Sequence, residues 1–568
     1  MDKPLLLLLC CLQFLPAAAQ KTPFEQSDGN ETATYGQVIS WFNMLDQKYE
    51  QAKLVQAGST DSGEPLHLFI LSENGNFEPG GDRPVLLINN GIHPGEPEGI
   101  DATMMLSRDM LEKNSLPENL VICIIPVYNV GGALNRNSYS RANQNGPRSY
   151  GFRGNSRNLD LNRDFIKTDS KNSQSFQQIF QRWKPHVFID NHTTNGADYQ
   201  HVITYIASQK DKLHPALAAY MTGSLNPVLD RILTDSCFPP VPYVHFRETT
   251  PESGLIGFYD SPRYSTGYSA LFNTIGYVLE THMLKPYEQR VRASYVFMEE
   301  LIAILERDHQ ALLEAKSLAD QKVKEQEEFT LHWRLDTTSF DTIEFRGYKA
   351  SYKKSELSGK PRLYYDTSHP YTKQIGFYND YRPVITVGRP KAYLVPQSWS
   401  RAIELLKLNG VTLQQLERDT EMEAEVYYIE DYKTVKTPYE GHYLHYDMQV
   451  RKEKQQVKCY KGDYLVHTNQ PSVRYIMEVL EPQAPDSYFA WNFFDSILGQ
   501  KEYFSAYVFE DLAADLLKAD KELKQQLEDK KKHDPEFAKN GAAQLDFIYR
   551  RSPYYEKSHL RYPIFRVN

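Results

Sequence analysis

The sequence predicts an α/β fold built on a largely parallel or mixed sheet. Up to about Glu314, short apolar runs alternate with stretches of helical periodicity, as in chains that cross back and forth over a sheet. Val85–Ile88 and Leu120–Ile125 are continuous apolar runs and therefore predict buried strands. Between them Ile100, Met104 and Leu111 recur at helical spacing after a loop that contains Pro and Gly. Two later apolar runs, Val187–Ile189 and Val278–Leu279, predict two more buried strands.

A change in composition divides the chain. We place the first domain at residues 24–310 and expect a charged helical connector at 311–328, because charged residues dominate from Glu306 to Glu328. From residue 329 the sequence turns to Tyr- and Thr-rich alternation broken by Gly and Pro. Residues 329–568 are expected to form a second, α+β region of unknown role, mostly β to about residue 466 and helical afterwards. One helix is predicted within the β part, at Ser400–Leu408, where Gly410 would end it.

The first residues predict export. Lys3 is followed by the apolar stretch Leu5–Leu9, and Ala17–Ala19 offers a small-residue cleavage site. Residues 1–19 are therefore interpreted as a cleavable signal peptide of a secreted or periplasmic protein. No later stretch is long and apolar enough to predict a membrane span.

Composition excludes several classes of protein. The net charge of −9 over 568 residues is mild and argues against a nucleic-acid partner. After loss of the signal peptide three scattered cysteines remain, Cys123, Cys237 and Cys459, which form neither a disulfide framework nor a zinc knuckle. The length exceeds one ordinary core, so at least two domains are expected.

The strongest chemical signal is His93-Pro94-Gly95-Glu96, directly after the first predicted strand. A His and a Glu three residues apart can reach one metal ion if the backbone between them turns, and catalytic zinc takes three protein ligands and keeps one position open. Taken alone, the pair could equally be a solvent-exposed loop pair. Two further strands, however, run out into His192 and Glu280, and in α/β sheets sites form at the carboxyl ends of strands.

Arginine and asparagine residues lie between these motifs in the sequence. Arg141-Ala142-Asn143 forms an RxN element, and Asp160-Leu161-Asn162-Arg163 follows it. The planar guanidinium of arginine, beside an amide, suits a free carboxylate, and a second cation would stabilise an oxyanion. An Asn- and Arg-rich surface loop is the alternative for this stretch.

The ordered set HxxE, RxN, DxNR, strand-ending His and strand-ending Glu, spread over roughly residues 25–310, resembles the zinc metallocarboxypeptidase family of the carboxypeptidase A and B type. The resemblance implies a mixed central sheet flanked by helices. It also implies a secreted metallopeptidase that hydrolyses C-terminal bonds of peptides or proteins with a free C-terminus, using a zinc-activated water. One Zn²⁺ would be held by His93, Glu96 and His192.

The same resemblance assigns the other roles. Arg141 would polarise the scissile carbonyl, Asn162 and Arg163 would bind the terminal carboxylate, and Glu280 would activate the water as general base. The family also has a mobile tyrosine upstream of its catalytic Glu. Tyr259, Tyr264 and Tyr268 are candidates here, of which Tyr259 is nearest in position. Four other histidines are interpreted as structural or as supports for the ligands: His186, His201, His245 and His282.

Two other functions stay open. A zinc amidohydrolase that deacylates N-acyl amino acids shares the HxxE, the Asn-Arg pair and a segment like His192-Thr193-Thr194. The peptidase is favoured because the RxN element is present and Asn162-Arg163 lies farther from the metal pair. A non-catalytic scaffold is the third possibility, and the presence of every expected catalytic group argues against it.

Overall fold

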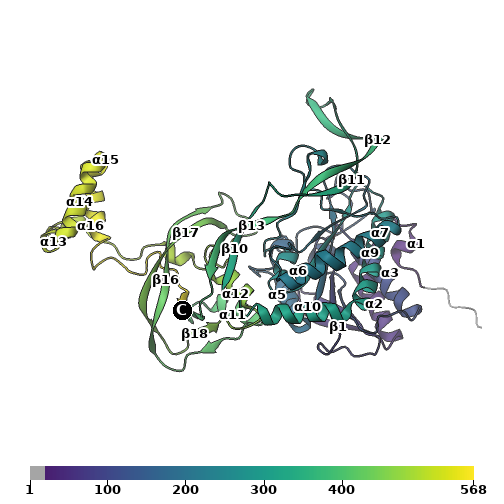
Figure 1. Ribbon diagram of the computed structural model, residues 1–568, viewed down its shortest axis with the longest axis horizontal. Coiled ribbons are helices and arrows are strands. Elements are labelled where there is room, and N and C mark those ends of the chain that lie inside the picture. Colours follow the sequence, from purple (N-terminus) through teal and green to yellow (C-terminus); the bar gives the residue numbers. More distant parts are fainter. Residues whose placement is uncertain (1–19) are drawn as a thin grey trace, which may run out of the picture.

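The computed structural model describes residues 20–568, so the predicted signal peptide lies outside the described residues. The N-terminal region, up to Glu327, is built on an eight-stranded sheet of order β1-β2-β4-β3-β5-β9-β6-β7 (Figure 1). Its strands are β1 (Ala52–Ser59), β2 (Pro65–Leu71), β3 (Val85–Asn89), β4 (Val121–Ile125), β5 (Val187–Thr194), β6 (Ile203–Ala207), β7 (Val241–Pro242) and β9 (Ile275–His282). The four central strands β4-β3-β5-β9 are parallel, whereas β2 and β6 join this set antiparallel. The predicted fold class, with a mixed central sheet, is confirmed.

Both faces of the central sheet are buried. Leu86 and Ile88 of β3 point into one core, which helices α2 (Tyr35–Lys48), α3 (Glu98–Glu112) and α9 (Tyr287–Arg307) complete. Leu87, between them, points into a second core on the opposite face, with α5 (Lys171–Trp183). This period of two explains why the strand sequences are continuously apolar.

The N-terminal region contains further helices and helical turns. They are α1 (Pro23–Gln26), α4 (Val130–Leu134), η1 (Leu161–Arg163), α6 (Pro215–Tyr220), η2 (Met221–Leu225), α7 (Asn226–Asp235), η3 (Pro251–Ser253), α8 (Ser265–Ala270) and α10 (His309–Lys322). No helix within residues 20–568 combines the length and the apolar character needed to traverse a lipid bilayer.

Helix α10 coincides with much of the expected charged connector, but it is not a free solvated helix. Leu312 and Ala319 are buried, and the Lys316 ammonium donates to the backbone oxygens of Phe272 and Asn273. Its charges therefore cover one face only, while the other face packs on the N-terminal region.

The C-terminal region is α+β, as the sequence predicts. Its larger sheet has the order β15-β18-β14-β19-β16-β17. The strands are β14 (Ala392–Val395), β15 (Gln414–Gln415), β16 (Thr420–Thr434), β17 (His445–Cys459), β18 (Tyr464–His467) and β19 (Phe565–Val567). Helix α11 (Ser400–Leu408) occupies the predicted residues, and Gly410, at φ +70°, follows its end. α12 (Val473–Leu480) and the turn η4 (Asp495–Leu498) follow β18.

The two regions share one apolar core. Val395, Leu406 and Trp491 of the C-terminal region belong to the same buried cluster as Leu87 and Phe176 of the N-terminal region. The composition change near residue 328 thus marks a change of architecture within continuous packing.

Part of the C-terminal region also returns to the N-terminal region. Strands β10 (Glu328–Leu335) and β13 (Tyr381–Gly388) pair with each other, and between them β11 (Asp341–Lys354) and β12 (Pro361–Tyr378) form a long projecting hairpin (Figure 1). The base of β12 pairs with β8 (Leu255–Ile256).

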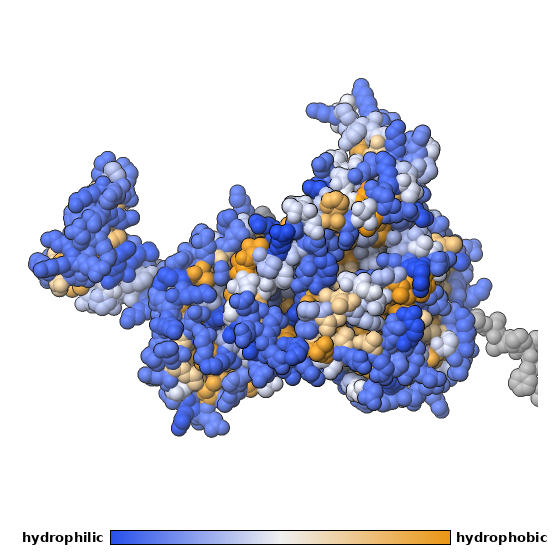
Figure 2. Space-filling model, viewed as in Figure 1, coloured by the Kyte–Doolittle hydropathy of each residue, from blue (hydrophilic) through white to orange (hydrophobic). Residues whose placement is uncertain are grey.

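Four helices near the C-terminus form a separate module. They are α13 (Ala506–Ala519), α14 (Lys521–His533), α15 (Pro535–Lys539) and α16 (Gly541–Tyr549). Phe509, Leu523 and Phe537 belong to an apolar cluster of their own. Figure 1 shows the module set apart and joined by two extended segments, and Figure 2 shows that its visible surface is mostly hydrophilic.

Candidate active site

The site forms where β3, β5 and β9 end side by side. His192 lies on β5 directly opposite Glu280 on β9, and the chain leaves β3 into the loop that carries His93 and Glu96. The Glu96 N–H donates to the His93 oxygen at 2.8 Å and closes a turn between them. Gly95 is needed here for space, since a Cβ would lie 2.3 Å from the Arg141 Nε.

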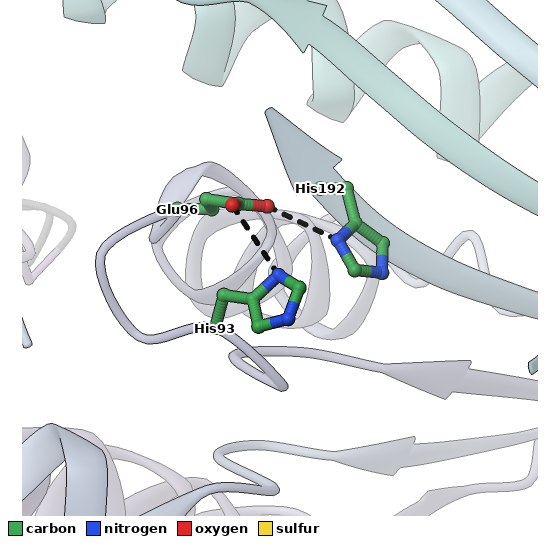
Figure 3. A group of neighbouring side chains, drawn as sticks. All are labelled: His93, Glu96 and His192. Carbon is green, nitrogen blue, oxygen red and sulfur yellow. Dashed lines mark hydrogen bonds and ion pairs between the residues drawn. The ribbon is translucent and has the colours of Figure 1, made fainter. Parts of the chain in front are cut away.

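Three side chains converge on one point. One ligand atom each from His93, Glu96 and His192 lies within 4.8 Å of the others, and all three side chains are buried (Figure 3). The Glu96 carboxylate faces both rings, with its oxygens 3.3 Å from His93 Nδ1 and 3.0 Å from His192 Nδ1. His93 Nδ1 is buried without a hydrogen-bond partner. Two imidazole nitrogens and one carboxylate oxygen are a donor set that zinc accepts, and the orphaned nitrogen is what such an ion would satisfy.

The far nitrogen of each imidazole contacts a carboxylate to which the sequence analysis assigned no role. Asp160 lies 2.9 Å from His93 Nε2, and Asp190 lies 3.0 Å from His192 Nε2. A carboxylate at this position fixes the ring and directs the other nitrogen at a metal. Asp190 could have been found from the sequence, because it precedes His192 by two residues on one strand and so shares its face.

These contacts shift the pKa values of the acidic groups. Burial favours the neutral form of Asp160, but His93, Arg153 and Arg163 outweigh it and hold the pKa of that carboxyl well below its usual value. Burial likewise opposes the charge on Glu96, and Arg141 and His93 lower the pKa of this carboxyl in spite of it. Glu96 is thus held in the charged state that a metal ligand requires, and Asp160 in the charged state that pairs with His93.

Arginines line the opening of the site. The Arg141 guanidinium contacts Glu96 Oε1 at 2.5 Å, and Arg153, which the sequence analysis did not single out, donates to Asp160 at 3.0 Å. Arg163 donates to the Asn162 oxygen at 2.8 Å and stacks over the Tyr264 ring at 4.5 Å. A cavity of about 220 Å³ is lined by the three ligands together with Arg141, Arg153, Asn162, Arg163, Tyr264 and Glu280.

Glu280 differs from the other carboxyl groups of the site. Its Oε2 is buried without a hydrogen-bond partner. Burial raises the pKa of Glu280 to about 8; Glu96 and Asp190 add to the rise, while His192 and Arg153 oppose it. Glu280 therefore lies beside the three candidate ligands as a carboxyl group whose neutral form is favoured by its surroundings.

Comparison with known proteins places these residues in a family. The family model described as zinc carboxypeptidase matches residues 38–228, a range that contains every predicted site residue before Tyr259. The chain carries a zinc carboxypeptidase domain. It is therefore an enzyme of the metallocarboxypeptidase class, and the resemblance read from its motifs is confirmed. The family match ends before Glu280.

Curated relatives extend beyond the matched range. Carboxypeptidase 2 of Trichophyton rubrum is 21% identical over 457 residues, which cover 74% of this chain and 76% of the relative. Probable carboxypeptidase 2 of Arthroderma benhamiae is 22% identical over 456 residues, covering 74% and 78%. Among solved structures, a metallo-carboxypeptidase from Burkholderia cenocepacia aligns at 14% identity and TM-score 0.37 over 49% of this chain and 70% of its own. Carboxypeptidase A from Helicoverpa armigera aligns at 15% identity and TM-score 0.37, covering 50% and 75%.

The three candidate tyrosines of this metallocarboxypeptidase lie in different places. Tyr264 lines the site cavity beside Arg163. Tyr259, the residue nearest in sequence position, does not line it; Lys212 lies over its ring and Tyr381 packs beside it. Tyr268 is in the core, where its hydroxyl donates to Asn409 at 2.7 Å. The conformation of the turn before α8 thus determines which of the three tyrosines lines the cavity. The spacing of the residues in the sequence does not reveal this conformation.

The other histidines lie outside the site cavity. His186 Nδ1 accepts from the Val85 N–H, and His201 contacts the Pro239 oxygen and the Arg346 N–H. His282 pairs with Asp198, and His245 is exposed.

The C-terminal region touches the loop between β4 and α5 that carries Asp160, Asn162 and Arg163. Glu440 Oε2 accepts from the Asp160 N–H at 2.8 Å, and His442 lies 2.8 Å from Asp169. Both belong to the loop between β16 and β17, and neither was singled out by the sequence analysis.

We predict that metal binding depends on the ligands and on the carboxylates behind them. His192→Ala should leave less than stoichiometric zinc after dialysis, because two donors remain. Asp190→Asn should lower zinc affinity by about ten- to a hundredfold, since the ring loses its charged partner. Zinc affinity measured by competition with a chelator checks both.

The matched control is His245→Ala, an exposed histidine outside the cavity, which should bind zinc as the wild type does. Stoichiometric zinc of unchanged affinity in His192→Ala would contradict the assignment.

Proposed function

We propose that this protein is a secreted, zinc-dependent carboxypeptidase that removes the last residue of peptides with a free C-terminus. The observation that carries the proposal is a single cavity of about 220 Å³ that brings Asn162, Arg163 and Glu280 to the three candidate zinc ligands. A metal site, a base and an anion-binding pair in one cavity are the parts that such a reaction needs.

Arg163 is proposed to bind the terminal carboxylate of the substrate. Its guanidinium lies over the Tyr264 ring, donates to the backbone oxygen of Asn162 and remains partly exposed. The remaining N–H groups of its fork suit a carboxylate, which can accept two parallel hydrogen bonds. Asn162 is its neighbour and lines the same cavity.

The other residues divide the chemistry of hydrolysis. When bound by His93, Glu96 and His192, zinc supplies a Lewis acid that makes water acidic enough to lose a proton near pH 7. Glu280 would take that proton as the water oxygen bonds to the carbon of the scissile carbonyl, and would deliver it to the amine nitrogen as the C–N bond breaks. Arg141 lies beside the ligands and stabilises the oxygen of the scissile carbonyl as negative charge develops. A divalent cation at the ligands also favours the charged form of Glu280 that the first step needs.

The last side chain of the substrate is proposed to be uncharged. The charged residues that line the cavity are the ligands, the three arginines and Glu280, all of which have the roles described above. The remaining wall is formed by Ile206, Tyr243, Phe258, Thr266 and Val278 together with small polar residues. A charged terminal side chain would lose its hydration there without gaining a partner.

A second candidate function is the deacylation of N-acyl amino acids, which also carry a free carboxylate. The peptidase is favoured by an adjoining cavity of about 270 Å³ on the side of Arg141, Arg153, Asn195 and Met283. A peptide would extend into this space, whereas a short acyl group would leave it empty. Chelator-sensitive release of amino acids from peptides but not from N-acyl amino acids distinguishes the two, and a scaffold would release neither.

We expect Glu280→Gln to abolish turnover while zinc and substrate binding persist. The amide keeps the shape of the side chain but cannot accept the proton, and a positioned base contributes about 10² to 10⁴ in rate. Turnover with a peptide ending in leucine and zinc content after dialysis are the two measurements. A variant with near wild-type kcat would rule Glu280 out as the base.

Arg163→Ala should lower kcat/KM on free-acid peptides by about tenfold to a hundredfold, as expected for loss of a charge-assisted contact. The wild type should already cleave C-terminally amidated versions of these peptides poorly, and the substitution should change that rate little. Equal wild-type activity on free and amidated peptides would refute the carboxypeptidase assignment and leave a zinc hydrolase standing.

Export is proposed from the predicted signal peptide, residues 1–19. Expressed in a host with a secretory pathway, the full chain should appear outside the cytoplasm with Gln20 or a residue close to it at its N-terminus. Mass spectrometry of the mature chain measures this, and retention of Met1 on active protein would contradict it.

A further inference from the structure

A second cavity of about 420 Å³ lies where α12 and β10 meet the N-terminal region. Residues from all three parts line it, and none of them lines the zinc-site cavity. Apolar and aromatic side chains form much of its wall: Tyr259, Leu271, Phe329, Leu331, Trp333 and Met477. Cavities at such junctions are common ligand sites when a few polar groups converge in them.

Arg474 of α12 brings an uncompensated positive charge to this cavity. Its guanidinium donates to the backbone oxygen of Lys212, but its Nε is buried without a partner. Burial lowers the pKa of Arg474 to about 10, and no carboxylate counteracts this within the described chain. A guanidinium enclosed without an anion is costly to the folded protein.

Glu478 brings an uncompensated carboxyl. It is 7% exposed, and its Oε1 is buried without a hydrogen-bond partner. Burial and the nearby Asp486 raise the pKa of Glu478 to about 8, against the opposing effects of Lys212 and Arg263. Glu478 follows Arg474 by four residues, so the two side chains leave the same face of α12 one turn apart.

The other acidic and basic side chains that line the cavity already have partners; His214 Nδ1, for example, accepts from the Ala216 N–H. Lys212 pairs with Asp260, Asp211 with Lys210, and Lys322 with Glu325. Arg474 and Glu478 are therefore the pair that a bound molecule would satisfy, one with a negative group and one with a positive group.

We propose that this cavity binds a free amino acid as a zwitterion, its carboxylate on Arg474 and its ammonium on Glu478. The spacing of one helical turn matches two charges carried by one small molecule, and both contacts would be charge-assisted. The apolar side chain would lie against Trp333, Phe329 and Leu331, so L-leucine is a suitable probe. The cavity shares no lining residue with the candidate zinc site, so the amino-acid site and the proposed reaction can be tested independently.

The experiment is calorimetric titration of the full-length zinc protein carrying Arg163→Ala, which removes the proposed carboxylate contact at the zinc site. L-Leucine should bind with one saturable event. L-Leucinamide, which lacks the carboxylate, and N-acetyl-L-leucine, which lacks the ammonium, should each bind at least about tenfold more weakly.

Substitutions in this background assign the two charges. Glu478→Gln should remove the preference for leucine over N-acetylleucine, and Arg474→Gln the preference over leucinamide. Lys322→Gln is the matched control, because this residue lines the cavity with its charge already paired, and it should bind leucine unchanged. Zinc content verifies that each variant is folded.

Three results would overturn the proposal: equal binding of the three ligands, leucine binding unaffected by both substitutions, or no saturable event up to about 10 mM leucine. If Arg474→Gln fails to fold, the ligand series on the parent protein decides alone. A second leucine event that persists despite Arg163→Ala and survives both α12 substitutions would count against Arg163 at the zinc site, and the two hypotheses are thus separable.

Discussion

The pairing of β5 with β9 is the constraint on which the site depends. In this parallel ladder His192 lies opposite Glu280. β3 pairs with the other edge of β5, and the loop that follows β3 carries His93 and Glu96. Side chains alternate between the two faces of a strand, so a slip of one residue would move His192 and its partner Asp190 to the opposite face. The continuous burial of Val187–Ile189 against both cores fixes the register, and the geometry of the candidate metal ligands follows from ordinary strand packing.

Several ionisable side chains are buried together at the ends of these strands. Burying such charges is costly unless opposite charges lie beside them. Glu96, Asp160, Asp190 and Glu280 are four carboxyl groups around two imidazoles, and Arg141 and Arg153 supply the fixed positive charge. Three of the carboxyl groups accept hydrogen bonds, whereas Glu280 Oε2 and His93 Nδ1 have no hydrogen-bond partner. A divalent cation at the ligands would satisfy the nitrogen and balance the excess of negative charge, which is why this arrangement fits a metal site better than a network of structural ion pairs.

The parts of the candidate site that depend on local sequence pattern could be predicted from the sequence. Strand-ending residues such as His192 and Glu280 could be predicted because an apolar run that ends in an ionisable residue places that residue at the carboxyl end of a buried strand, where sites form. The contact of Asp190 with His192 could also have been predicted, because residues two apart on a strand share a face. The position of Tyr264 could not be predicted, because three tyrosines lie in one short segment and the turn in that segment decides which ring lies next to Arg163. Arg474 and Glu478 resemble an ordinary helical ion pair in sequence, and only the structure shows that Arg474 Nε and Glu478 Oε1 are buried without hydrogen-bond partners.

Most features of the candidate site that local sequence pattern could not predict are contacts between residues far apart in the sequence. Glu440 reaches the Asp160 N–H across 280 residues, and Arg263, in the turn before Tyr264, pairs with Asp486 at 2.8 Å. The loops on two sides of the zinc-site cavity therefore each take a charged partner from the C-terminal region. A chain ending near residue 310 would lack these partners, and it would also lack the side chains that the C-terminal region contributes to the shared apolar core. The similarity to the curated relatives also covers 74% of the chain, well beyond the matched domain of residues 38–228. The C-terminal region thus contacts both the loop that carries Asp160, Asn162 and Arg163 and the turn before Tyr264, and we infer that it helps to hold these two segments in place.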